Sequence, residues 1–178
     1  MNLFIQSLTY FRIFTAPIIF LLITYFHFYG LALIFFILSS ASDYWDGFFA
    51  RKYNLESKLG EILDPIADKI LTSFLLFSFA IELSSTFIAL AGAIIIAREF
   101  WVSALRDLNA RNQKTDLTKV TLFAKAKTAT QFVTFFSYIL ALYTNSALLL
   151  FISNFLLILA LIITIQTGLS YTTATFRK

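Results

Sequence analysis

Four aspartates in the first half of the chain fall into two pairs with helical spacing. Asp43 and Asp46 are three residues apart. Asp64 and Asp68 are four apart, so within each pair both side chains share one face of a helix. Residues with little or no side chain accompany them on these faces, namely Gly47, Ala50, Gly60 and Ala67. If the two segments are adjacent helices, four carboxylates meet, and a ligand has room to approach the backbone beside them.

Carboxylates that crowd together in this way repel one another, so they either take up protons or bind cations. All-oxygen ligand sets select hard cations such as Mg²⁺ or Mn²⁺, and two divalent ions would balance four negative charges. Arg51 ends the first of the two segments and suits a phosphate group. The pattern therefore favours a metal site that holds a polyphosphate. The alternative left open is a charge network in which the acids pair with Arg51, Lys52, Lys58 and Lys69.

The elements that must position these acids are predicted to be long apolar helices. Of the 178 residues, 59% are hydrophobic and 13% are charged, whereas soluble domains carry about 25% charged residues. This composition excludes a soluble globular domain and a disordered chain, and the absence of cysteine excludes a disulfide scaffold. One membrane crossing needs about 20 apolar residues, so the chain has room for about six. The predicted spans are residues 9–27, 30–52, 60–82, 86–109, 120–143 and 147–170.

The distribution of positive charge orients the predicted bundle. All 14 lysines and arginines lie toward the side of both termini and of the connections 53–59 and 110–119, while the turns near residues 28, 83 and 145 carry none. By the positive-inside rule, both termini and these two connections are cytoplasmic. No pattern of a signal or transit peptide is found. We therefore expect an all-α, multi-pass protein of the bacterial plasma membrane, with six transmembrane helices, one catalytic domain over residues 1–178 and the acids at the cytoplasmic face.

Eight residues within a stretch of 26 form a spaced pattern, and they are Asp43, Asp46, Gly47, Ala50, Arg51, Gly60, Asp64 and Asp68. This pattern resembles the signature of the CDP-alcohol phosphotransferase family, with every fixed position filled. The segments 8–13, 96–106 and 124–131 are similar to the bacterial phosphatidylglycerophosphate synthases of that family. The resemblance covers about residues 3–170 and is weakest in the last span. It departs at Ile5 and Gln6, where Pro and Asn are expected, and at Ala124, where Gly is expected.

This resemblance implies the fold of that family and a transfer of the phosphatidyl group from CDP-diacylglycerol to sn-glycerol 3-phosphate. The reaction releases CMP and belongs to the biosynthesis of phosphatidylglycerol and cardiolipin. The implied ligands of two divalent cations, Mg²⁺ or Mn²⁺, are Asp43, Asp46, Asp64 and Asp68, and Asp68 is also the implied general base. The implied CDP-diacylglycerol site consists of Gly47, Ala50, Arg51, Ser57 and Gly60. The family is typically dimeric, so a homodimer is expected, and no nucleic acid is an expected partner.

The acceptor would carry a phosphate dianion, so its pocket needs fixed cations. The candidates at the predicted cytoplasmic face are Arg98 and Lys125, then Arg106 and Lys127, and also Arg12. Each of them has the alternative interpretation of a long side chain that reaches to the membrane interface. Glu99 and Arg106 share one helix face, which leaves open that Glu99 rather than a substrate holds Arg106.

Two other functions are compatible with membrane carboxylates. Acids within membranes often mark ion paths, so an ion-coupled transporter is one alternative. The chargeable groups stop at one face here, which disfavours a continuous path across the membrane. The second alternative is a related transferase that uses another acceptor, such as phosphatidylglycerol, inositol phosphate or serine. The stretches around Arg98 and Lys127 favour glycerol phosphate by resemblance.

Overall fold

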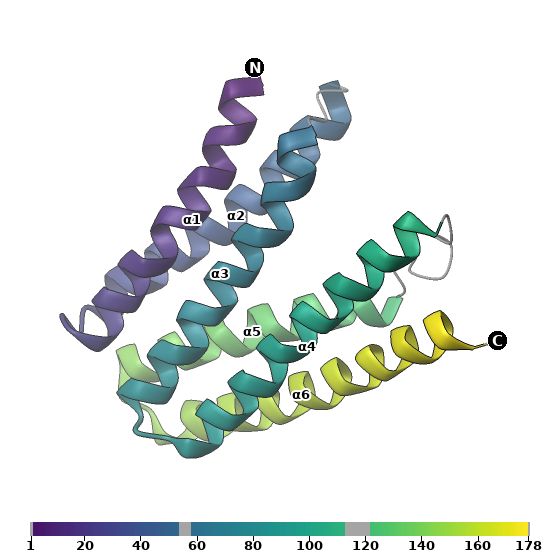
Figure 1. The fold of residues 1–178 in the computed structure, drawn as a ribbon. Helices are drawn as coiled ribbons and strands as arrows, with labels where there is room; N and C mark the ends of the chain where they lie inside the picture. Colours follow the sequence, from purple (N-terminus) through teal and green to yellow (C-terminus); the bar gives the residue numbers. More distant parts are fainter. Residues whose placement is uncertain (1, 54–57, 113–121, 178) are drawn as a thin grey trace. The chain divides into compact units, whose positions relative to one another are not determined.

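The computed structural model describes the backbone of residues 2–53, 58–112 and 122–177, and the side chains of residues 7–42, 45, 60, 62–112 and 126–177. Within these residues the chain forms six helices (Figure 1). They are α1 (Asn2–Thr24), α2 (Tyr29–Tyr53), α3 (Lys58–Glu82), α4 (Thr86–Arg111), α5 (Leu122–Thr144) and α6 (Ala147–Phe176). The prediction of an all-α fold is confirmed, and each predicted span overlaps one helix.

Three segments within these helices are long and apolar enough to cross a membrane. They are Ser7–Thr24, Thr86–Arg111 and Ala147–Phe176, and Tyr29–Ser42 forms a shorter apolar stretch. These segments indicate a membrane protein. The helix α3 is less uniformly apolar because its first half carries acids and a lysine, among them Asp64, Asp68 and Lys69. That all six helices cross the membrane, with both termini in the cytoplasm, stays a prediction.

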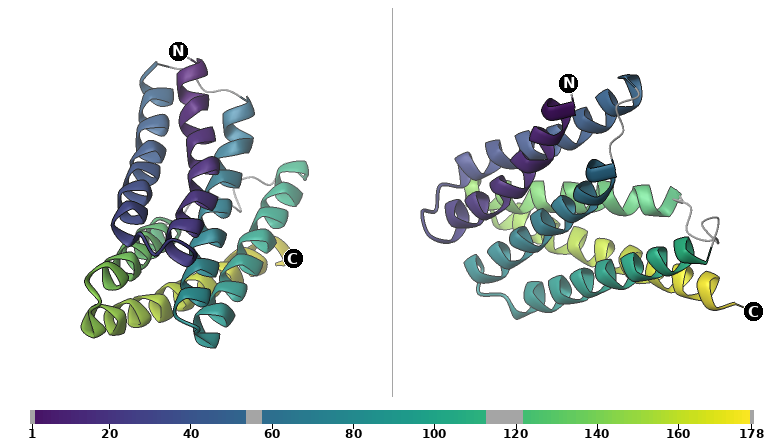
Figure 2. Two further views of the ribbon diagram at one scale, coloured as in Figure 1. Left: turned by 90° about the vertical axis from the view of Figure 1, so that its left-hand side faces the viewer. Right: turned by 45° about the horizontal axis from the view of Figure 1, so that its top comes forward.

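The helices group into two compact units, residues 1–88 and 89–178, and each is described by itself. In the first unit α1 packs against both α2 and α3, and the three helices run alongside one another in Figure 2. Ala16 and Ile19 of α1 and Ala67 of α3 are fully buried, and the two alanines allow a close approach of helices. The prediction of one catalytic domain over the whole chain stays a prediction.

The register between α1 and α3 is set by two polar contacts. Thr9 contacts Asp64, and Arg12 contacts Asp68. The two contacting residues are 55 positions apart in the first pair and 56 in the second, so the difference in residue number is nearly constant. A constant offset means that the two helices run in the same direction. The helix α1 therefore lies with one polar face against the acidic face of α3.

In the second unit α5 and α6 form an antiparallel hairpin. The hydroxyls of Ser137 and Ser153 lie 2.7 Å apart, and the Tyr138 hydroxyl donates to Oδ1 of Asn154 at 2.8 Å. In a lipid bilayer, apolar side chains gain little by leaving the lipid for a helix interface. Polar pairs of this kind therefore help to hold the helices together. The turn between these helices contains Asn145 with φ of 49°, a left-handed conformation that asparagine tolerates better than most residues.

The helix α4 runs parallel to α6 in the same unit. Trp101 donates from Nε1 to Oγ1 of Thr172 at 2.9 Å, and Asn109 donates from Nδ2 to Oγ1 of Thr175 at 2.8 Å. These contacts extend along the last turns of both helices. The helix α6 continues to Phe176, beyond the predicted span, and this extension supplies Thr172 and Thr175.

Part of the inner face of α5 is polar. Lys127, Gln131, Thr134 and Tyr138 are all buried, and their spacing of four, three and four residues places them on one side of the helix. The unit therefore encloses a polar stripe rather than a purely apolar core.

Candidate active site

The acidic face of α3 carries Asp64 and Asp68 one helical turn apart. The helix is continuous from Lys58 to Glu82, so the two carboxylates point to the same side. Thr9 donates from Oγ1 to Oδ1 of Asp64 at 2.8 Å. Asp68 is 56% exposed at its side chain, so a ligand can reach this carboxylate from outside the first unit.

Arg12 of α1 lies beneath the acidic face, with its side chain only 1% exposed. Its Nη1 donates to Oδ1 of Asp68 at 2.7 Å, the length of a charge-assisted hydrogen bond. A buried guanidinium needs an anionic partner to offset its lost hydration, and Asp68 supplies one. The predicted role of Arg12 as an acceptor-binding cation stays a prediction. The contact with Asp68 favours a different role, the orientation of that carboxylate.

The other residues predicted for the metal and nucleotide sites lie outside the described side chains. They are Asp43, Asp46, Gly47, Ala50, Arg51 and Ser57. Gly60 is described, and it lies half-buried in the first turn of α3. Among the described residues no three acids or histidines lie close enough to hold a metal ion. Two of the four predicted ligands fall outside those residues, so the metal site stays a prediction.

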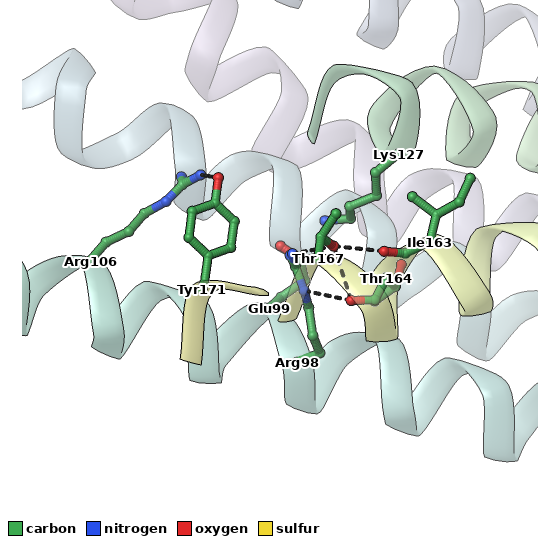
Figure 3. Close-up of polar contacts among 8 residues, drawn as sticks. All are labelled: Arg98, Glu99, Arg106, Lys127, Ile163, Thr164, Thr167 and Tyr171. Atoms are coloured by element: carbon green, nitrogen blue, oxygen red, sulfur yellow. Dashed lines mark hydrogen bonds and ion pairs between the residues drawn. The ribbon is translucent and has the colours of Figure 1, made fainter. Parts of the chain in front are cut away.

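A second group of charged residues lies in the second unit, where α4, α5 and α6 meet (Figure 3). Arg98 of α4 is central to it and is almost entirely buried. Its Nε donates to the main-chain oxygen of Thr164 at 3.0 Å, and its Nη2 donates to Oγ1 of Thr167 at 2.6 Å. Its Nη1 contacts Oε1 of Glu99 at 3.2 Å. These contacts hold the planar guanidinium in one orientation.

Glu99 joins this arginine to α5. Its Oε1 also accepts a hydrogen bond from Nζ of Lys127, so one carboxylate oxygen holds two cations from two helices. Within the described part of the chain the partners of Glu99 are Arg98 and Lys127, so the interpretation that Glu99 holds Arg106 is not supported by these contacts. A shared face on α4 does not reveal that α5 brings Lys127 to the same carboxylate.

Arg106 contacts the aromatic side chain of α6 instead. Its Nη2 lies 3.4 Å from the hydroxyl of Tyr171, and its guanidinium carbon lies 5.4 Å from the centre of that ring. A guanidinium over an aromatic face gains a cation–π attraction. Arg98 lies 6.0 Å from the same ring, so Tyr171 stands between the two arginines.

We call Arg98, Arg106 and Lys127, together with Glu99, the cationic cluster. Three cations and one carboxylate leave a formal charge of +2, which suits a phosphate dianion. Guanidinium groups recognise phosphate oxygens through paired N–H donors. The structure thus brings together three of the five cations that were predicted for the acceptor. Arg12 lies in the first unit, and Lys125 falls outside the described side chains.

Comparison with known proteins matches residues 5–166 to the family described as CDP-alcohol phosphatidyltransferase. The chain belongs to this family. The match covers the acidic signature as well as most of the second unit, so membership in the CDP-alcohol phosphatidyltransferase family rests on nearly the whole chain.

Three proteins similar to this chain carry the same name. A protein of Wigglesworthia glossinidia brevipalpis is 37% identical over 133 residues, 73% of this chain and 72% of that protein. A protein of Escherichia coli K12 is 35% identical over 129 residues, 71% of this chain and 70% of that protein. One of Sodalis glossinidius is 38% identical over 96 residues, about half of each chain. All three are named CDP-diacylglycerol–glycerol-3-phosphate 3-phosphatidyltransferase.

Several residues around the cationic cluster were not predicted from the sequence. Thr164, Thr167 and Tyr171 of α6 contact the arginines, and Gly168 lies against the stem of Arg98. A Cβ at Gly168 would lie 3.0 Å from Cγ of Arg98, so a larger residue at this position would require the arginine side chain to shift. The spacing of 164, 167, 168 and 171 was the available signal, since it places small and polar residues on one face of an otherwise apolar helix.

Proposed function

We propose that the chain transfers the phosphatidyl group of CDP-diacylglycerol to sn-glycerol 3-phosphate and releases CMP. The observation that carries this proposal is the set of relatives with that name, two of which align with about 70% of the chain at 35–37% identity. The family match favours transfer chemistry over ion transport. The product would be phosphatidylglycerol phosphate, a precursor of phosphatidylglycerol and cardiolipin.

Two divalent cations, Mg²⁺ or Mn²⁺, would be held by Asp43, Asp46, Asp64 and Asp68. The donor set fits such ions because carboxylate oxygens are the ligands that hard cations prefer. When bound, the ions would neutralise the diphosphate of the donor and stabilise the departing CMP. The residues proposed to bind the rest of the nucleotide are Gly47, Ala50, Arg51, Ser57 and Gly60.

Asp68 is the proposed general base. It would accept the proton of the C1 hydroxyl of the acceptor while that oxygen forms a bond to the β-phosphorus of the donor. The bond from this phosphorus to the oxygen of CMP breaks, and CMP leaves with the electron pair. Arg12 and Thr9 support the step by fixing one oxygen each of Asp68 and Asp64, so that both carboxylates keep their orientation.

The cationic cluster is the proposed site of the acceptor phosphate. Its support is the net positive charge and the oriented guanidinium of Arg98, with Lys125 as a further proposed contact. The positive-inside pattern supports a proposed location of this cluster and of the acidic face of α3 at the cytoplasmic face of a bacterial plasma membrane. That location gives access to soluble glycerol phosphate. A homodimer in this membrane also stays a proposal.

The test is an acceptor panel with purified protein, CDP-diacylglycerol and Mg²⁺, with CMP release as the readout. We expect CMP release that depends on sn-glycerol 3-phosphate and that stops when EDTA removes the divalent ions. Inositol phosphate, serine and phosphatidylglycerol are the alternative acceptors. Faster release with any of them than with glycerol phosphate would overturn the proposed acceptor, and release that persists in EDTA would overturn the metal requirement.

A further inference from the structure

Two buried polar groups in the second unit have no hydrogen-bond partner within the described part of the chain. They are Nε2 of Gln131, in a residue that is 8% exposed, and Oγ1 of Thr164, in a residue that is fully buried. Leaving such a group unsatisfied lowers stability, and native structures contain few of them. A ligand that supplies the missing hydrogen bonds is one reason to retain both.

Both groups adjoin the cationic cluster. The main-chain oxygen of Thr164 accepts the hydrogen bond of Arg98, so this threonine is already part of the wall around the guanidinium. Gln131 follows Lys127 by four residues on α5, and both side chains are buried on the same face. The unsatisfied groups therefore approach the cluster from two helices.

The antiparallel register of α5 and α6 places Gln131 and Thr164 within about one helical turn of each other along the hairpin. Ser137 contacts Ser153, and Tyr138 contacts Asn154. Because the helices are antiparallel, each step back along α5 corresponds to a step forward along α6, and Thr164 therefore lies level with Lys127. Gln131 lies about one turn, or about 6 Å, further along α5. The residue opposite it at that level is Ala160, which is fully buried and has a small side chain.

Neighbouring hydroxyls in the same unit are satisfied inside their own helices. Thr134 donates to the main-chain oxygen of Thr130 at 2.7 Å, and Thr167 donates to that of Ile163 at 2.7 Å. Thr164 makes no such bond, although a helical threonine has a carbonyl within reach one turn earlier. Its hydroxyl therefore keeps unused hydrogen-bonding capacity in a buried position beside the cluster.

We propose that Gln131 and Thr164 form a subsite that binds the non-reacting C2 hydroxyl of a polyol phosphate acceptor whose phosphate lies on the cationic cluster. An amide N–H donates to such a hydroxyl, and a threonine hydroxyl both donates and accepts, so the pair complements a group that does both. This inference rests on the proposed function, because it assigns the acceptor phosphate to the cationic cluster. It adds a determinant of acceptor specificity that charge alone does not provide.

The experiment compares two acceptors that differ only in that hydroxyl, sn-glycerol 3-phosphate and 1,3-propanediol monophosphate. The readout is kcat/KM for CMP release by the full chain with CDP-diacylglycerol. We expect the unaltered protein to prefer glycerol phosphate by at least about 100-fold, because a site built to bind a hydroxyl is left unsatisfied by its absence. Gln131→Leu and Thr164→Val should each lower this preference by about tenfold or more. The change should come from slower use of glycerol phosphate.

The matched control is Thr134→Val, which makes the same substitution at a buried hydroxyl that is satisfied within α5. It should leave the preference unchanged, and Thr164→Ser, which keeps the hydroxyl, should retain it. If Gln131→Leu and Thr164→Val slow both acceptors equally, the two residues have only a structural role and the inference is wrong. A lack of preference in the unaltered protein would refute it as well. Absence of CMP release with every acceptor would instead refute the proposed function, and the subsite with it.

Discussion

Replacement of Asp64 by asparagine should lower kcat by at least about 10³-fold, because the amide keeps the size of the side chain but removes the charge that a divalent cation needs. The hydrogen bond from Thr9 can persist, since the amide oxygen also accepts, so the fold of the first unit should survive. Asp68→Asn should have an effect at least as large, because this residue is also the proposed base. The measurement is CMP release at saturating substrates, with folding checked by size-exclusion chromatography.

The control for this prediction is Asp107→Asn. Asp107 lies exposed on α4, pairs with Arg111 at 2.8 Å and has no proposed role in binding a ligand. An exposed pair of this kind contributes little to stability, so the variant should retain nearly full activity. If Asp64→Asn and Asp68→Asn retained the activity of this control, the assignment of α3 to the reaction centre would be wrong.

The second large effect is expected at the acceptor site. Arg98→Ala should raise the KM for glycerol phosphate by about 10- to 100-fold, because it removes a charge-assisted contact to the phosphate. The KM for CDP-diacylglycerol should change little. Arg98→Lys should restore only part of the affinity, since an ammonium group cannot reproduce both contacts that the guanidinium makes with α6.

Gly168→Ala tests the same site without removing a charge. The added Cβ would lie 3.0 Å from Cγ and 3.4 Å from Nε of Arg98, so the arginine has to shift. We expect a smaller rise in the same KM. Arg111→Ala is the matched control, because Arg111 is exposed and pairs only with Asp107 among the contacts described here. An unchanged KM in Arg98→Ala would exclude this arginine from acceptor binding.

The sequence was sufficient for the helical architecture and for the acidic signature. Both are local patterns: apolar runs of span length predict helices, and aspartates at spacings of three and four predict acidic faces. Asp64 and Asp68 do share a face of α3 in the structure. The family also followed from this local signature, and the comparison confirmed it.

The partners of the charged residues could not be predicted, because they come from distant parts of the chain. Arg98 is held by residues 66 and 69 positions later, and Arg12 contacts Asp68 56 positions later. No local periodicity determines which faces of two distant helices meet. Thr164 and Gly168 could not be predicted for a second reason, namely that isolated small or weakly polar residues do not stand out within a strongly apolar span.

The central claim is that the four aspartates together hold two divalent cations. The most direct measurement is a titration of the purified protein with Mn²⁺, followed by the electron paramagnetic resonance signal of the free ion, in the presence of CDP-diacylglycerol and without acceptor. Saturation at two Mn²⁺ per chain, with fewer ions bound in Asp43→Asn, Asp46→Asn, Asp64→Asn and Asp68→Asn, is the predicted result. Absence of saturable binding, or a stoichiometry that none of these four substitutions changes, would contradict the claim.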